Sequence, residues 1–137
     1  MTFVLDCSVT VAWLFEDEAM PAVDALQDRL KEASALVPAL WRLEVGNVLA
    51  QAERRKRIAP AQTSAHLELL ERLPVTTDTE TDRRAFREIL SLARTEGLTT
   101  YDAAYLELAA RRGVALATLD RRLVQAARRL GVDTLPS

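Results

Sequence analysis

Four acidic side chains have the types and positions that metal-assisted chemistry requires. Asp6 follows a short apolar run near the start of the chain, and Asp120 follows another near its end. Asp102 stands at the entrance of an apolar helical pattern, and Glu44 lies within a second one. Carboxylate oxygens are the ligands that Mg²⁺ and Mn²⁺ prefer. If the fold gathers these acids, the site suits phosphoryl or phosphodiester chemistry, in which a metal activates water and neutralises developing charge.

The three aspartates each have an ordinary structural alternative, which is helix capping. Aspartate is favoured at the N-cap and in the first helical turn, so capping alone would explain Asp6 or Asp120. Thr99 and Asp102 resemble a capping box, although Glu or Gln is the usual residue three positions after the cap. Capping and metal binding therefore both remain open for these three positions.

Glu44 is harder to explain as a surface residue. The predicted buried face of its helix consists of Trp41, Val45, Val48 and Ala52. Glu44 projects inside the edge of that stripe, where a carboxylate costs several kcal/mol unless it is paired, protonated or bound to a cation. The structural alternative is an internal salt bridge with an arginine. Asn47, one turn further on, is placed to hydrogen-bond the same group.

Short apolar runs alternate with longer helical patterns, and these elements must position the acids. The predicted strands are 3–5, 35–37, 75–77, 114–118 and a short edge strand at 133–135. The predicted helices are 8–15 with Ser8 as its cap, 21–32, 39–56, 60–73, 81–95, 99–113 and 121–130. We therefore expect an α/β fold, a single-domain three-layer sandwich over residues 1–137, with a mainly parallel four- to five-stranded sheet flanked by helices. Ligands bind at the carboxyl ends of such strands, where Asp6 and Asp120 lie.

Composition limits the class of protein. With 49% apolar and 28% charged residues among 137, the chain is too apolar to be disordered. A net charge of −2 argues against nucleic-acid binding through bulk charge. A single Cys and a single His exclude an internal disulfide and make zinc an unsuitable metal. No secretory signal or membrane-spanning run is recognisable, so we expect a soluble, cytoplasmic protein without a membrane.

Four segments together resemble the PIN-domain family, and within it the VapC-type toxin ribonucleases of bacterial toxin–antitoxin pairs. The segments are VLDCS at 4–8, PALWRLEVGN at 38–47, LTTYDAAY at 98–105 and ATLDRRL at 117–123. Each segment alone is a weak signal, but the four occur in order and at family-like spacing. The match covers nearly the whole chain and implies a PIN-like fold.

The resemblance implies a metal-dependent endoribonuclease holding one or two Mg²⁺ or Mn²⁺ ions. The family's four acids fall on Asp6, Glu44, Asp102 and Asp120, and its small polar residues near the metal fall on Ser8, Asn47 and Thr118. Activated water would attack the scissile phosphate in line, leaving a 5′-phosphate and a 3′-hydroxyl. The resemblance also implies a toxin of the type II class, a homodimer, and a cognate antitoxin that silences the site.

Arginines supply the charge that an RNA substrate would need. Arg111, Arg112, Arg121 and Arg122 flank the strand that precedes Asp120, so we expect them to contact RNA phosphates. The basic run 54–57 is explained by its place at a helix C-terminus.

Two other functions fit parts of the pattern. A Mg²⁺-dependent phosphotransfer or phosphatase domain also gathers acids at strand ends, but it needs a late lysine, and no lysine follows Lys56. An inert binding module with the same fold is the second alternative, and the presence of all four acids argues against it.

Overall fold

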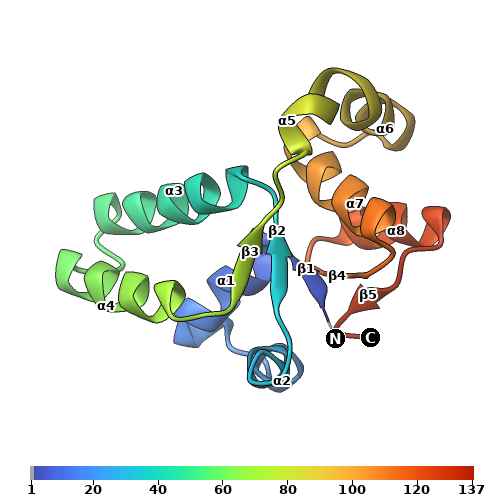
Figure 1. Ribbon diagram of the computed structural model, residues 1–137. Helices are drawn as coiled ribbons and strands as arrows, with labels where there is room; N and C mark the ends of the chain where they lie inside the picture. The colour runs from blue at the N-terminus through green and yellow to red at the C-terminus, as the bar shows by residue number, and fades with distance from the viewer. Residues whose placement is uncertain (1) are drawn as a thin grey trace.

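A five-stranded parallel sheet forms the centre of the molecule in the computed structural model, which describes residues 2–137 (Figure 1). The strands are β1 (Phe3–Leu5), β2 (Ala35–Val37), β3 (Val75–Thr77), β4 (Ala115–Ala117) and β5 (Thr134–Leu135), in the order β3-β2-β1-β4-β5. Val4 of β1 pairs with Leu36 of β2 on one side and with Leu116 of β4 on the other. β1 and β2 are buried throughout, because helices cover both faces of the sheet.

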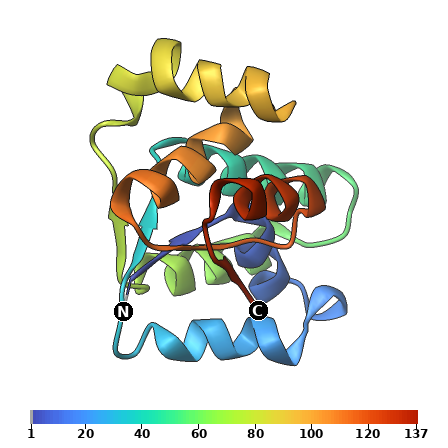
Figure 2. The ribbon, with the colours of Figure 1, turned by 90° about the vertical axis from the view of Figure 1, so that its right-hand side faces the viewer.

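Eight α-helices connect and cover these strands. They are α1 (Cys7–Leu14), α2 (Pro21–Arg29), α3 (Leu40–Arg54), α4 (Pro60–Glu71), α5 (Thr81–Arg84), α6 (Leu90–Glu96), α7 (Thr100–Arg112) and α8 (Arg121–Leu130). A π-helical turn over Ala85–Ile89 joins α5 to α6. Figure 1 shows α1–α4 to the left of and below the sheet and α5–α8 to its right and above, and Figure 2 shows α2 and α5–α6 at opposite ends of the molecule.

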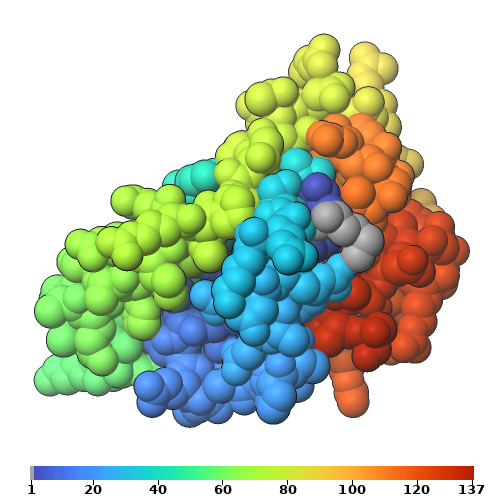
Figure 3. All heavy atoms as spheres, turned by 60° about the horizontal axis from the view of Figure 1, so that its bottom comes forward, coloured from blue at the N-terminus to red at the C-terminus, as the bar shows by residue number. Residues whose placement is uncertain are grey.

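The winding of the chain places a topological switch point between β1 and β4. From β1 the chain moves outward through β2 to β3, and it then returns to the other side of β1 for β4 and β5. Adjacent strands that start crossovers in opposite directions leave a crevice at their carboxyl ends, which is where ligands bind in open α/β sheets. The α3–α4 pair, green in Figure 3, extends to one side of this body.

The structure confirms the predicted architecture, with corrections at particular residues. Strands 3–5, 35–37 and 75–77 lie where they were predicted, whereas Val114 and Thr118 fall outside β4. The prediction that Ser8 caps the first helix is wrong: Asp6 occupies the N-cap, and Ser8 lies inside α1 and donates to Asp6. On α3, Leu49 is buried and Val48 only half-buried, because the contact stripe is rotated slightly from the predicted one.

The core is built mainly from small and aliphatic side chains. Its largest fully buried members are Tyr105, Phe3, Leu5 and Leu49, and α7 lies across β1 and β4 with a run of buried residues from Ala103 to Ala109. Helices α6 and α7 end at Gly97 and Gly113, whose φ angles of 66° and 65° lie in the left-handed region that glycine adopts without strain. No helix within residues 2–137 has the length and apolar character that crossing a bilayer demands.

An ion cluster ties the loop after β3 to α7. The Arg111 guanidinium donates to both Asp78 oxygens at 3.1 and 2.8 Å and to Glu107 Oε1 at 2.7 Å. The Thr81 hydroxyl also donates to Asp78, at 2.8 Å. The hydrogen bonds from Arg111 hold the pKa of Asp78 at about 2, below its ordinary value of 3.8. Because the side chains of Asp78 and Arg111 are only 3% and 12% exposed, solvent screens this pair weakly.

We expect Asp78→Asn to lower the free energy of unfolding by about 2 kcal/mol at neutral pH, the value of a pKa shift of this size. The folded-state pKa lies below the unfolded one, so the stabilisation is present above pH 4 and disappears as pH falls towards 2. Urea unfolding of wild type and variant at several pH values measures this difference. Asp82→Asn, an exposed change in the next helix, is the control. A difference between Asp78→Asn and wild type that stays constant from pH 7 to the lowest accessible pH would contradict this explanation.

Candidate active site

The sheet's switch point brings the two strand-end aspartates together. Asp6 directly follows β1, and its backbone N–H donates to the carbonyl of Ala117, the last residue of β4, at 3.0 Å. Asp120 follows three residues after Ala117 and is the N-cap of α8. The expectation from sequence that both acids lie at one edge of the sheet is therefore met by the pairing of β1 with β4.

The Asp6 carboxylate is buried and held by two hydroxyl groups. It is 5% exposed, and its Oδ2 accepts hydrogen bonds from Ser8 Oγ at 2.6 Å and Thr118 Oγ1 at 2.8 Å. Each hydroxyl is oriented in turn by a backbone N–H: Leu119 donates to Ser8 at 2.9 Å, and Asp120 donates to Thr118 at 3.1 Å. Both hydroxyl protons therefore point at Asp6. Ser8 and Thr118, predicted from the resemblance as polar neighbours of the site, contact its central carboxylate directly.

Glu44 is linked to α7 through a buried tyrosine. Tyr105 is fully buried, and its hydroxyl donates to Glu44 Oε1 at 2.5 Å. No arginine or lysine within residues 2–137 forms an ion pair with Glu44, so the salt-bridge alternative does not hold there. Burial raises the pKa of Glu44, Tyr105 partly offsets this shift, and the charges of Asp6 and Asp102 raise the pKa further.

Asp102 and Asp120 are the other two acids of the candidate site, and they differ in their part in helix capping. Thr99 Oγ1 accepts from the backbone N–H of Asp102 at 3.1 Å, so Thr99 is the cap of α7 and the Asp102 carboxylate is left for other contacts. Asp120 does cap α8, because its Oδ1 accepts from the backbones of Arg122 and Leu123. Within residues 2–137 no donor is bonded to Asp120 Oδ2.

The acids lie near enough to one another for their charges to interact. Burial raises the pKa of Asp102, and the charges of Asp120 and Asp6 raise it further. Burial likewise raises the pKa of Asp6, against the lowering effect of Ser8 and Thr118. Carboxylates that raise one another's pKa repel, and a bound cation relieves that repulsion.

The donor set fits a hard divalent cation. All the candidate ligands are oxygens, and the adjoining Cys7 is unsuited as a thiolate ligand because burial, with the charges of Glu44 and Asp6, raises its pKa to about 12. Within residues 2–137 no three Asp, Glu, His or Cys side chains lie close enough together to hold a metal ion by themselves. A cation bound here would therefore need water and substrate phosphate as further ligands, in the way that Mg²⁺ is commonly bound through one or two carboxylates.

The remaining predicted residues lie at different distances from this centre. Asn47 is exposed on the rim of a shallow pocket of about 340 Å³, whose other lining residues are Leu40, Leu43, Glu44 and Tyr101, and no hydrogen bond joins it to Glu44 within residues 2–137. Arg121 and Arg122 are exposed in the first turn of α8, and Arg122 is near enough to Asp102 to lower its pKa. Arg112 is exposed at the opposite end of α7 from Asp102.

The structure does not support a phosphate-binding role for Arg111. Its guanidinium is occupied by Asp78, Glu80 and Glu107, and it lies nine residues after Asp102 on α7, about 14 Å along the helix axis. Sequence position placed Arg111 beside the strand that leads to Asp120, but at the amino end of that strand.

Tyr105 is the functional residue that sequence reasoning missed. It stands three residues after Asp102, on the same side of the helix, within a run of apolar residues. From that pattern, the sequence predicts only an ordinary core residue at this position. A tyrosine that is buried needs a partner for its hydroxyl, and that requirement is the signal in the sequence that pointed to a nearby acid.

Comparison with known proteins assigns the class. The family model described as "PIN domain" matches residues 3–129, so the chain belongs to the PIN-domain family. Among relatives, "Ribonuclease VapC3" of Pyrobaculum aerophilum is 30% identical over 125 residues, covering 91% of this chain and 94% of the relative. "Ribonuclease VapC3" of Mycobacterium tuberculosis is 34% identical over 104 residues, covering 74% and 72%. Both alignments confirm the resemblance to VapC-type proteins.

Solved structures show the same fold. PAE2754 from Pyrobaculum aerophilum superposes with a TM-score of 0.72 at 25% identity, covering 98% of this chain and 90% of that one. VapBC2 from Rickettsia felis, bound to a DNA fragment from its promoter, gives a TM-score of 0.69 at 14% identity, with coverage of 98% and 97%. FitAcB from Neisseria gonorrhoeae gives 0.66 at 19%, with coverage of 98% and 96%.

We expect Tyr105→Phe to weaken Mn²⁺ binding by about tenfold or more while the protein stays folded, since losing a group that orients a ligand typically costs 10- to 100-fold in metal affinity. The change removes one hydrogen bond and keeps the buried ring. Isothermal titration with Mn²⁺ measures the effect, with Tyr101→Phe at an exposed tyrosine as the matched control. Equal affinity for Mn²⁺ in wild type and Tyr105→Phe would show that this hydrogen bond does not position Glu44.

Proposed function

We propose that this PIN-domain protein is a metal-dependent endoribonuclease and the toxin of a type II toxin–antitoxin pair. The observation that carries the proposal is the mutual electrostatic influence of Asp6, Glu44, Asp102 and Asp120 near the switch point, where no cationic side chain within residues 2–137 forms an ion pair with them. Two relatives aligned over most of their length carry the name ribonuclease VapC3, which supports RNA as the substrate. The whole chain would act as one nuclease domain.

The reaction is hydrolysis of a phosphodiester bond. Water attacks phosphorus as the bond to the 3′ oxygen breaks; one proton of the water passes to a base, and the 3′ oxygen takes up a proton. The products are a 5′-phosphate and a 3′-hydroxyl. When bound, Mg²⁺ or Mn²⁺ lowers the pKa of water and neutralises charge on the phosphate.

The chain's own residues divide the remaining work. Ser8 and Thr118 fix Asp6 Oδ2, which leaves Oδ1 for the cation. Tyr105 occupies Glu44 Oε1, so Oε2 is left to bind the cation or the water from which it takes a proton. Asp102 and Asp120 Oδ2 supply further oxygens for the cation and its waters. Arg122 stands beside them to attract the phosphate.

The partners follow from the same class. The structures similar to this chain include VapBC2 and FitAcB, and these support a cognate antitoxin that binds the toxin. We propose a homodimer as the state of the free toxin and the cytoplasm as its location.

We expect Asp6→Asn and Asp120→Asn each to reduce cleavage by about 10²–10³-fold, the loss seen when one electrostatic stabiliser is removed. Asparagine keeps an oxygen to accept the hydroxyls of Ser8 and Thr118, so the fold should survive. The assay is cleavage of a mixed RNA pool with Mg²⁺ or Mn²⁺, against EDTA, with mapping of the product ends. Asp24→Asn, exposed on α2, is the control. Undiminished cleavage by either purified variant would refute the site, and a folded, metal-loaded wild type that cuts no RNA would favour an inert module.

Metal should also stabilise the folded protein. The raised pKa values of Asp6, Glu44 and Asp102 mean that the folded state binds more protons, so metal-free protein loses stability as pH rises through these values. A cation offsets this repulsion, and about 2.7 kcal/mol is gained at a concentration 100 times its Kd. We expect Mg²⁺ or Mn²⁺ to raise Tm more at pH 7 than at pH 4, where protons compete. Differential scanning fluorimetry at both pH values tests this, and a Tm indifferent to metal at pH 7 would argue against the site.

A further inference from the structure

Helix α8 concentrates positive charge that the rest of the chain does not neutralise. It carries four arginines and no acid, in a chain whose net charge is −2. Arg121, Arg122, Gln125 and Arg128 are exposed. Within residues 2–137 only Arg129 of the four arginines forms an ion pair, with Glu96 at 2.7 Å. The α8 face, defined as Arg121, Arg122, Gln125 and Arg128, is therefore a basic surface without carboxylate partners.

The helix dipole favours only the two arginines at the C-terminal end of α8. Arg128 in the last turn interacts favourably with the negative end of the helix dipole. Arg121 and Arg122 stand in the first turn, where the helix dipole disfavours a cation. Asp120 occupies the cap between them and the site, so the unfavourable end of α8 is also the end that meets the acidic cluster. An anion bound at the site would stabilise arginines placed there.

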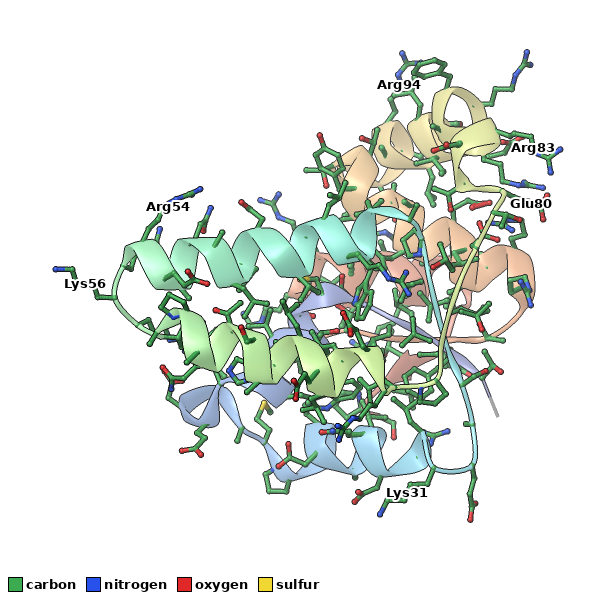
Figure 4. All side chains as sticks on the ribbon, turned by 60° about the vertical axis from the view of Figure 1, so that its left-hand side comes forward. Lys31, Arg54, Lys56, Glu80, Arg83 and Arg94 are labelled. Carbon is green, nitrogen blue, oxygen red and sulfur yellow. The ribbon has the colours of Figure 1, made fainter. Side chains whose placement is uncertain are left out.

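Several other basic groups within residues 2–137 are paired with acids or lie far from the candidate site. Arg57 is bound by Asp17 and Glu18, and Arg111 is buried in its ion cluster. Figure 4 shows Arg83 beside Glu80, with which it forms an ion pair, and shows Arg54 and Lys56 at the far end of the α3–α4 pair. The α8 face is the basic surface that starts at the candidate active site.

We propose that the α8 face binds the phosphate backbone of single-stranded RNA next to the bond that is cut, an inference that rests on the proposed ribonuclease function. Helical spacing puts Arg121, Gln125 and Arg128 within one stripe, and α8 extends for about 15 Å from Asp120. Guanidinium groups bind phosphate oxygens through paired N–H donors, and Gln125 adds a neutral donor. Such contacts to phosphate do not depend on the base sequence of the RNA.

The test measures binding separately from cleavage. The full chain is titrated against a fluorescent, unstructured RNA oligonucleotide in EDTA, over a series of KCl concentrations, in wild type, Arg121→Gln/Arg128→Gln and the control Arg54→Gln/Arg55→Gln. Each lost phosphate contact should reduce the steepness of log affinity against log salt by about 0.7, so the α8 variant should lose about 1.4. In Mg²⁺ the α8 variant should show a higher KM with kcat retained, since these residues hold RNA without touching the reacting atoms.

Each other result has a distinct meaning. If wild type cleaves RNA but the α8 variant keeps the wild-type salt dependence and KM, the inference about α8 is wrong and the ribonuclease function stands. If the control pair loses as much as the α8 pair, the effect is one of net charge, and the inference is again wrong. If wild type neither binds nor cleaves RNA, the proposed function itself fails. Binding of an acidic polypeptide such as polyglutamate that only the α8 variant loses, with RNA binding unchanged, would assign the face to a protein partner.

Discussion

The buried carboxylate of Asp6 is the constraint on which the candidate site depends. A carboxylate that is 5% exposed must be hydrogen-bonded or neutralised, and two hydroxyls satisfy one of its oxygens. One hydroxyl comes from α1 and the other from Thr118, the residue after β4. These two segments lie side by side because β1 and β4 are neighbours in the sheet. The parallel pairing of these strands therefore positions Asp6, Ser8 and Thr118 in one step. A shift of one residue in that register would turn Thr118 away from Asp6.

Placing three more acids near Asp6 lowers the stability of the metal-free folded protein. Burial raises the pKa values of Asp6, Glu44 and Asp102, and neighbouring acids raise those of Glu44 and Asp102 further; the hydrogen bonds from Tyr105, Ser8 and Thr118 offset only part of these shifts. In the ion cluster of α7, by contrast, a buried acid is paired with a cationic side chain. Asp78 is also buried, yet Arg111 lowers its pKa to about 2, so that cluster is self-sufficient. This contrast between a paired acid and acids without a cationic partner, within residues 2–137, distinguishes a structural ion pair from the proposed cation site.

Much of this arrangement was predictable because it follows from local pattern. Strand ends put Asp6 and Asp120 at one edge, the helical period put Glu44 inside α3, and the order of alternating elements predicted the parallel sheet. Three of the errors involve a partner distant in sequence. Ser8 was expected to cap its own helix, but its hydroxyl donates to Asp6 and accepts from Leu119, 111 positions away; Tyr105 bonds a glutamate 61 positions away; and Arg111 is held by an aspartate 33 positions away. Residue propensity and hydrophobic periodicity describe one segment at a time, so they do not predict which side chains of different segments pair.

The distribution of charge joins these observations into one physical account of substrate recognition. RNA brings a line of negative charges to a protein whose own net charge is −2, and whose reacting centre is a set of carboxylates that would repel it. A divalent cation reverses the sign of the field at the scissile phosphate, but its influence is screened within about one Debye length. Beyond that distance the approach depends on fixed positive groups. Helix α8 supplies them from the point where the acids end, because Asp120 is both the last acid of the site and the cap of that basic helix. Capping and metal binding, which from sequence alone were alternatives for Asp120, are thus compatible in one side chain: Oδ1 anchors α8, and Oδ2, to which no donor within residues 2–137 is bonded, is left for the proposed site.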